Sequence, residues 1–129
     1  MYYDLDSVEE FSEELGFSVN RLSADALNIE IFEGVTLEFL NLQDTKESLV
    51  GFYGTPWHCH DKLALMTGKT TYVELDELDI IQSIKSGVIL VVERYLSGNL
   101  NDRWMAHKDE RMDFQYIEPG EELRIRRLA

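Results

Sequence analysis

The residues best suited to chemistry lie in one short segment, Trp57-His58-Cys59-His60-Asp61. Two of the three histidines and the only cysteine of the chain fall within three consecutive positions. In an extended strand, His58 and His60 would point to the same face and could bind one metal ion, with Cys59 on the opposite face. In a helix, the two imidazoles would lie about 200° apart and could not bind one ion together. The hairpin expected after this segment favours the extended conformation.

A metal site would need a third ligand, and His107, Asp61 or a distant carboxylate is the candidate. No second pair of ligands at metal-site spacing occurs elsewhere in the sequence. The alternative is that Trp57 packs into the core while the histidines hydrogen-bond to the backbone beside the turn at Gly54-Thr55-Pro56. We prefer this alternative, so we expect no tightly held metal and no cofactor. A metal-dependent enzyme that uses the two histidines is the second hypothesis.

The same segment resembles the first motif of the cupins, in which a glycine precedes a His-x-His pair in a β-barrel. The matching residues are Gly51, His58, His60 and Gly68. Cupins place a glutamate a few residues after the second histidine, where this sequence has Ala64 and Leu65. The resemblance covers about a seventh of the chain and implies a barrel with a metal held by the histidine pair.

Other catalytic patterns are weak in this sequence. Cys59 beside a histidine could act as a nucleophile with its base, but a catalytic base usually lies far away in sequence. A lone buried cysteine is the commoner case. Glu93, Asp102 and Glu118 lie on expected strands or turns, and their spacing defines no acid–base pair. With no glycine-rich phosphate loop and no nucleophile-elbow serine, we predict no catalytic residue.

Charge is the strongest overall signal. Twenty-five acidic residues stand against twelve Lys and Arg residues, which gives a net charge of −13. Residues 1–50 hold twelve acids and two bases, whereas residues 51–129 hold thirteen acids and ten bases. Such a field repels phosphate backbones and attracts basic surfaces, so we expect a basic protein partner and no direct nucleic-acid binding. Acidity that merely keeps the protein soluble is the alternative explanation.

Length and composition predict one soluble domain over residues 1–129, with 44% hydrophobic residues to build its core. The longest aliphatic run, residues 88–92, is far shorter than the roughly 20 residues of a membrane span. The amino terminus shows neither the basic flank nor the apolar stretch of a signal peptide. A single cysteine cannot form an internal disulfide. We therefore expect a cytoplasmic protein without membrane contact.

The pattern of residues predicts an α+β fold with a mostly antiparallel sheet of five or more strands and two helices. The first helix is expected over about residues 8–15, with Ser7 as N-cap and Gly16 at its end. Its outer face carries Glu9, Glu10, Glu13 and Glu14. These form two like-charged pairs four residues apart, which destabilise the helix slightly.

A second helix is expected over about residues 77–86, capped by Asp76, with Leu78, Ile81 and Ile84 facing the core. Residues 49–53 are expected to form a strand, and four hairpins complete the sheet. They pair residues 26–32 with 35–42, 62–66 with 69–75, 88–96 with 100–108, and 114–117 with 123–128.

Two further groups of side chains are candidates for contacts. Arg124, Arg126 and Arg127 form a basic end in an acidic protein, and we expect them to pair with the acidic amino-terminal half, with anion binding as the alternative. Trp104 and Met105 point to opposite faces of an expected strand, so one of them is expected to be exposed. Because an exposed aromatic side chain rimmed by charge is a common interface anchor, Trp104 and Trp57 are candidate partner contacts.

The small size, the net charge of −13 and the lack of catalytic motifs resemble the character of bacterial immunity proteins. These neutralise a cognate toxin, often a basic nuclease, by covering its substrate cleft with carboxylates. The resemblance implies a protein-binding role within a toxin–antitoxin pair. The predicted partner-binding residues are Glu9, Glu10, Glu13, Glu14, Trp57 and Trp104. A third hypothesis is a structural or regulatory subunit that self-associates through a sheet edge.

Overall fold

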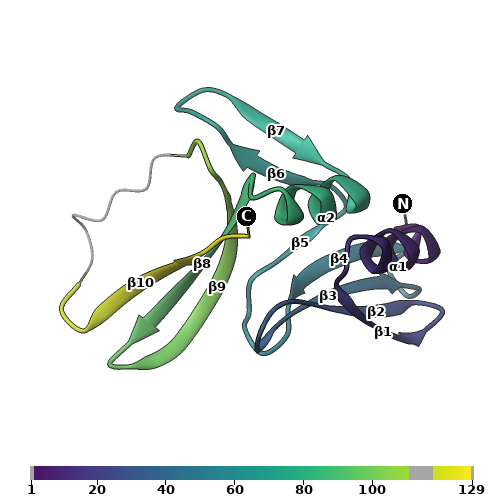
Figure 1. Ribbon diagram of the computed structural model, residues 1–129, viewed down its shortest axis with the longest axis horizontal. Coiled ribbons are helices and arrows are strands. Elements are labelled where there is room, and N and C mark those ends of the chain that lie inside the picture. The colour runs from purple at the N-terminus through teal and green to yellow at the C-terminus, as the bar shows by residue number, and fades with distance from the viewer. Residues whose placement is uncertain (1, 111–117, 129) are drawn as a thin grey trace.

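The computed structural model describes residues 2–110 and 118–128, which contain two helices and ten strands (Figure 1). The helices are α1 (Leu5–Glu14) and α2 (Glu77–Lys85). The first strands are β1 (Ser18–Ser23), β2 (Ala26–Phe32), β3 (Val35–Leu42), β4 (Glu47–Phe52) and β5 (His58–His60). They are followed by β6 (Leu63–Met66), β7 (Tyr72–Leu75), β8 (Ile89–Leu96), β9 (Asn99–His107) and β10 (Glu121–Arg126). The predicted α+β class and antiparallel sheet of five strands are confirmed.

The strands form three antiparallel sheets. β1 to β5 form a five-stranded meander in which each strand pairs with the next one in sequence. β8 lies between β10 and β9 in a three-stranded sheet, and β6 pairs with β7 in a hairpin. β1 and β5 are the two edges of the five-stranded sheet, which is therefore open and differs from the barrel that the cupin motif implies. In Figure 1, α1 lies over one face of this sheet and the three-stranded sheet lies at the opposite end of the molecule.

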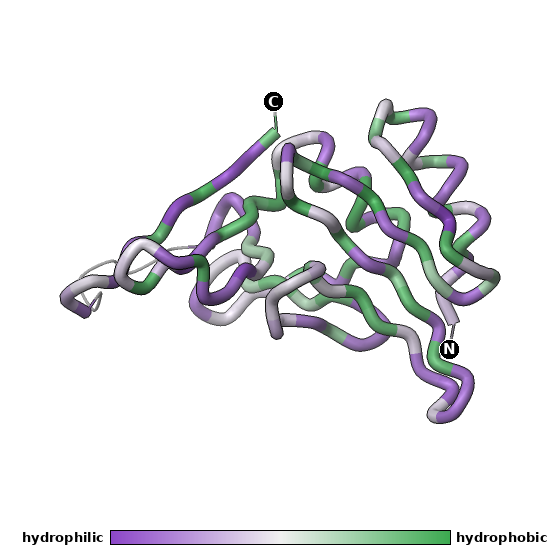
Figure 2. Tube along the Cα trace, turned by 90° about the horizontal axis from the view of Figure 1, so that it is seen from below, coloured by the Kyte–Doolittle hydropathy of each residue, from purple (hydrophilic) through white to green (hydrophobic). Residues whose placement is uncertain are grey.

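One face of the five-stranded sheet lies in the core. Its fully buried side chains are Leu27, Ile29, Leu37, Phe39 and Val50. Val8 of α1, three isoleucines of α2, and Ile89, Val91 and Met105 of β8 and β9 belong to the same hydrophobic cluster. Figure 2 shows the hydrophobic segments running through the strands and hydrophilic residues at the turns. Alternation with a period of two therefore sets which strand residues face the core.

The first helix begins three residues earlier than predicted, and its cap is Asp4 in place of Ser7. The Asp4 carboxylate accepts hydrogen bonds from the Ser7 backbone N–H at 3.1 Å and from its hydroxyl at 2.8 Å. These bonds, the hydroxyl bond first, lower the pKa of Asp4 below its usual value. Because Leu5 is buried, an extra turn before Ser7 adds core contact as well as a cap.

The second helix confirms the predicted capping box of Asp76 and Asp79, but one predicted core residue was wrong. Asp79 N–H donates to Asp76 Oδ1 at 2.8 Å, and Asp76 N–H donates to Asp79 Oδ2 at 3.2 Å. Leu78 is 36% exposed, and Ile80 takes its place beside Ile81 and Ile84. The buried stripe therefore follows the spacing i, i+1 and i+4.

Most predicted hairpins agree with the structure, and β1 is an additional strand. β2 and β3 have the predicted bounds, and β6–β7 and β8–β9 form the next two hairpins. β1 was not predicted, because only Val19 and Arg21 of its six residues face inward. β10 pairs with β8, while the expected strand at residues 114–117 lies outside the described residues.

Candidate functional site

The outer face of α1 carries three exposed carboxylates, those of Glu10, Glu13 and Glu14, which we call the α1 carboxylate face. The structure gives none of the three a hydrogen bond or an ion pair with any described residue. The opposite side of the helix buries Leu5, Val8 and Ser12. The α1 carboxylate face therefore points to solvent, as predicted, and nothing in the described chain neutralises it.

Glu9 was also predicted to contact a partner protein, but it forms an ion pair within the chain. Arg21 of β1 places its Nη1 at 2.9 Å from both Glu9 Oε1 and Asp6 Oδ1. Its Nε and Nη2 donate to the carbonyl oxygens of Ser23 and Ala24, which fix the guanidinium. The sequence signal for this contact was Arg21 itself, the only arginine among the first fifty residues.

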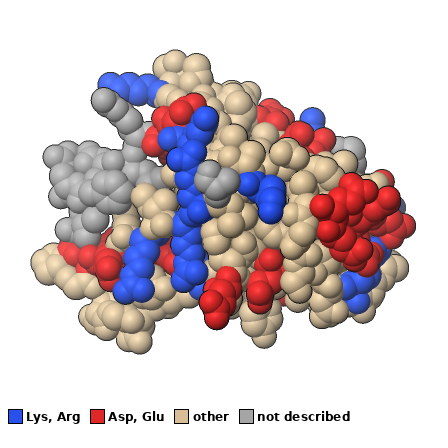
Figure 3. Space-filling model, in the orientation of Figure 1, with Lys and Arg blue, Asp and Glu red and all other residues tan. Residues whose placement is uncertain are grey.

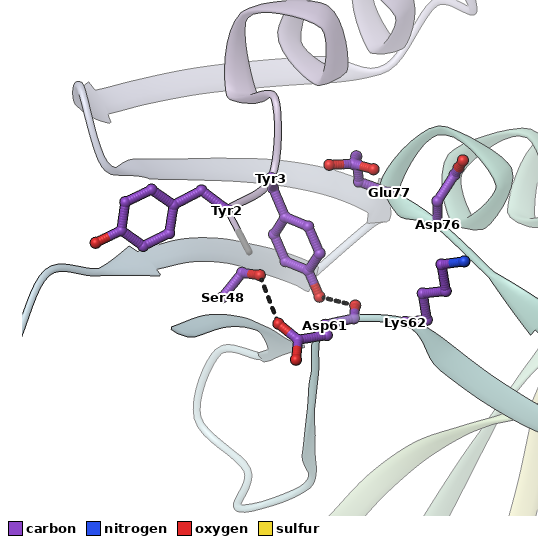
Figure 4. Close-up of a pocket in the computed structure, with 7 residues that line it drawn as sticks. All are labelled: Tyr2, Tyr3, Ser48, Asp61, Lys62, Asp76 and Glu77. Carbon is purple, nitrogen blue, oxygen red and sulfur yellow. Dashed lines mark hydrogen bonds between the residues drawn. The ribbon is translucent and has the colours of Figure 1, made fainter. Parts of the chain in front are cut away.

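The residues before α1 tie it to β3, to the residue after β5 and to α2, and Figure 4 shows the Tyr3 hydroxyl directed at Asp61. Tyr3 N–H donates to Asn41 Oδ1, and Asn41 Nδ2–H donates to the Tyr3 carbonyl, each at 2.9 Å. The Tyr3 hydroxyl donates to the Asp61 carbonyl at 2.5 Å, and Asp4 N–H donates to Glu77 at 2.9 Å. Burial raises the pKa of Tyr3, so its hydroxyl stays a donor. The α1 carboxylate face is thus held on a fixed helix.

A small cavity of about 50 Å³ lies beside these hydrogen bonds of Tyr3. Figure 4 shows the residues around it: Tyr2, Tyr3, Ser48, Asp61, Lys62, Asp76 and Glu77. Ser48 Oγ donates to Asp61 Oδ1 at 3.2 Å. A space of this size holds a water molecule or two but no organic ligand, so we assign it a structural role.

His58 and His60 lie on the face of the five-stranded sheet opposite α1. Both are exposed, and their ring centroids are 5.2 Å apart with the rings nearly perpendicular. The segment is therefore an extended strand and not a helix, which is the conformation that the sequence favoured. His107 is buried at the end of β9 in the three-stranded sheet. Its Nδ1 accepts a hydrogen bond from Asp109 N–H at 3.1 Å. Across the described ranges, no three His, Cys, Asp or Glu side chains form a group arranged to hold a metal ion.

Cys59 points the other way, toward the core. Burial, with a smaller contribution from the charge of Asp61, raises the pKa of its thiol to about 11. The thiol is therefore neutral at physiological pH and a weak nucleophile. The geometry gives no support to a cysteine–histidine catalytic pair.

Neither tryptophan is fully exposed. Trp57 packs on Phe52 with ring centroids 5.6 Å apart, and its backbone N–H donates to Asp102 at 3.3 Å. Trp104 is half-buried, whereas Met105 on the opposite face of β9 is buried. The most exposed aromatic side chain among the described residues is Tyr53, at 66%. Sequence reasoning missed it because nothing local distinguishes an outward tyrosine from an inward one at a strand end.

The basic end of the chain does not pair with the acidic amino-terminal half, so this expectation was wrong. Arg126 donates to Glu93 at 2.7 Å, Arg124 donates to Glu122 at 3.2 Å, and Arg127 donates to the Gly87 carbonyl at 2.8 Å. Antiparallel pairing of β10 with β8 brings Arg126 close to Glu93, whereas Glu122 lies in the same strand as Arg124. Figure 3 shows the result: carboxylates gather over α1, and basic side chains form a separate band near the three-stranded sheet.

Comparison with known proteins adds no relative. No protein-family model, curated protein sequence or solved structure matches the chain. Within the described residues, no helix combines the length and apolarity that crossing a bilayer requires.

Proposed function

We propose that this chain is a binding module for a basic protein, and specifically a bacterial immunity protein that neutralises a toxin with a basic, nuclease-type cleft. The observation that carries the proposal is the α1 carboxylate face. Three exposed carboxylates have no cation beside them, while every described arginine already contacts an anionic or carbonyl oxygen. A cation supplied by a partner is therefore the missing complement.

The position of these carboxylates on the helix strengthens the argument. Glu13 and Glu14 lie in the last turn of α1, where the helix dipole disfavours negative charge. Glu10 and Glu14 are also four residues apart and repel each other. The free protein thus carries an electrostatic cost that a basic partner relieves on binding. Such an arrangement raises the association rate and suits rapid capture of a toxin.

The two hydrogen bonds between Tyr3 and Asn41 support the same proposal. Because backbone and side-chain bonds hold the residues before α1, the helix needs no ordering when a partner arrives. The proposal places the protein in the bacterial cytoplasm, where a single cysteine stays reduced. It also implies that nucleic acid is not a ligand, since the α1 carboxylate face repels phosphate.

Growth protection tests the immunity role. The reading frame next to this gene in the native host is expressed in a heterologous bacterium, alone and together with this chain. We expect growth arrest with the neighbour alone and growth with both proteins. If the neighbour arrests growth and this chain neither binds it nor restores growth, that neighbour is not its toxin and the immunity role fails.

A further inference from the structure

The geometry points to a two-histidine site for one divalent transition-metal ion on β5, with Nε2 of His58 and Nε2 of His60 as its ligands. This site lies on the face of the five-stranded sheet opposite α1, so it is separate from the α1 carboxylate face. Imidazole nitrogen is a good ligand for Zn²⁺, Ni²⁺ and Cu²⁺. Both side chains are exposed, which leaves an open path for the ion.

The hydrogen bond of His58 leaves Nε2, the proposed ligand atom, free. Nδ1 of His58 lies 3.0 Å from the Pro56 carbonyl oxygen. A carbonyl oxygen only accepts, so in the neutral ring Nδ1 carries the hydrogen and Nε2 carries the lone pair. Metal-binding histidines usually donate their other ring N–H to a carbonyl or carboxylate in this way.

His60 has a similar arrangement. Its Nδ1 lies 3.7 Å from Oε2 of Glu47, which follows the β3–β4 turn on the same face of the sheet. This distance is longer than a direct hydrogen bond, but the carboxylate favours the tautomer with the hydrogen on Nδ1 and the lone pair on Nε2. Both rings therefore have their Nδ1 atoms directed to oxygen and their Nε2 atoms available.

The separation of the two rings fits one shared ion. An ion about 2.0–2.1 Å from each Nε2 lies about 3.2 Å from each ring centre. At a tetrahedral angle, two such ring centres are about 5 Å apart. The observed separation is 5.2 Å, and the two rings are nearly perpendicular.

The neighbouring strand leaves room beside His58. Gly51 of β4 lies directly opposite His58, and a Cβ atom there would lie 2.9 Å from His58 Cβ. The absence of this side chain lets β5 approach β4 closely, and Glu38 of β3 is paired with Gly51 on the other side of β4. Carboxylates on this face, Glu38 and Glu47, add a negative field that favours a cation.

Water completes the coordination in this arrangement. Cys59 faces the core, and no third metal ligand is in place within the described residues. Two protein ligands give a weak and exchangeable site compared with a closed structural site.

Calorimetric titration of the chelator-treated full chain with zinc chloride and nickel chloride tests the site. We expect one equivalent per chain at neutral pH. H58N and H60N, which keep a short amide near the Nδ1 position and remove Nε2, should each weaken binding about tenfold or more. H107N is the matched control, because its amide oxygen can still accept from Asp109 N–H, and it should bind like the parent chain.

Three results would overturn the site. One is the absence of binding by the parent chain at millimolar zinc and nickel. Another is unchanged binding by H58N and H60N, with circular dichroism showing that both variants are folded. Loss of binding in H107N to the same extent as in H58N also counts against the assignment, because it would place the ion elsewhere.

Discussion

Glu93 of β8 binds the last strand of the protein through Arg126, whose Nε lies 2.7 Å from Glu93 Oε1. The second carboxylate oxygen accepts from Arg103 Nε of β9, also at 2.7 Å. The Glu93 side chain has no exposed surface, whereas those of Arg103 and Arg126 are 11% and 38% exposed, so this ion triad crosses all three strands of the sheet with its anion buried. Burial of a charge is tolerated there because both oxygens are paired with arginine.

Removing the Glu93 charge should destabilise the fold strongly. E93Q leaves two arginines without their anion, and we expect it to lower the free energy of unfolding by about 3 kcal/mol. E122Q is the matched control, because Glu122 forms only an exposed pair with Arg124 and should cost less than about 1 kcal/mol. Urea denaturation measures both values. Equal effects of the two substitutions would contradict the structural role of Glu93.

The same triad predicts how stability depends on pH. Burial alone would raise the pKa of Glu93, but the hydrogen bonds and charges of Arg103 and Arg126 outweigh it and lower the pKa. A lowered pKa in the folded state means that the stabilisation is complete above the pKa of the unfolded chain, about 4.3, and is lost as the pH falls through the folded value. The parent chain should therefore lose more stability than E93Q between pH 6 and pH 3 in urea titrations. Parallel pH profiles for the two proteins would refute this prediction.

Local signals explain what the sequence predicted correctly. The hairpin turn at Glu33-Gly34 and the capping box at Asp76 depend on residues within a few positions, so their bounds agree closely with the structure. The exposed α1 carboxylates followed from helical periodicity alone, although the start of the helix did not, because Asp4 and Ser7 are both good caps.

Contacts between distant residues explain what could not be predicted. Glu93 and Arg126 are 33 positions apart, and their contact depends on the register of β10 against β8. The pairing of Arg21 with Glu9 likewise needed β1, whose polar sequence gives no strand signal. The 5.2 Å separation of the His58 and His60 rings depends on their side-chain rotamers, which the sequence does not predict. Their position on one face of the sheet follows from the strand conformation alone.

Two glycines with similar backbone angles should respond differently to alanine. Gly16 and Gly87 have φ of +91° and +78°, so both substitutions carry the strain of a left-handed residue, about 1 kcal/mol. A Cβ at Gly16 meets no described atom within 4 Å, whereas one at Gly87 would collide with the Leu128 carbonyl. We expect G87A to cost about 1–3 kcal/mol more than G16A in urea denaturation. Equal costs would show that the C-terminal residues move aside freely.

The thiol of Cys59 should react slowly. Its pKa of about 11 lies about two units above the ordinary value, so the thiolate fraction at pH 8 is about 100-fold lower than for a free cysteine. Iodoacetamide labelling followed by mass spectrometry should show this difference in the native protein, and unfolding in urea should abolish it. Rapid labelling of the native protein would mean that the thiol is accessible and ionised.

The association rate of a basic partner, identified through the gene neighbour or by affinity capture, tests the α1 carboxylate face most directly. The variant E10Q/E13Q/E14Q removes three charges, and E30Q/E33Q/E74Q removes three exposed charges elsewhere as a matched control. We expect the α1 variant to bind about tenfold more slowly than the parent chain at low salt, the control to differ little, and the difference to shrink at 150 mM salt. An unchanged rate in the α1 variant, or a rate insensitive to salt, would contradict the account and move the interface to the surface around Trp57 and Trp104.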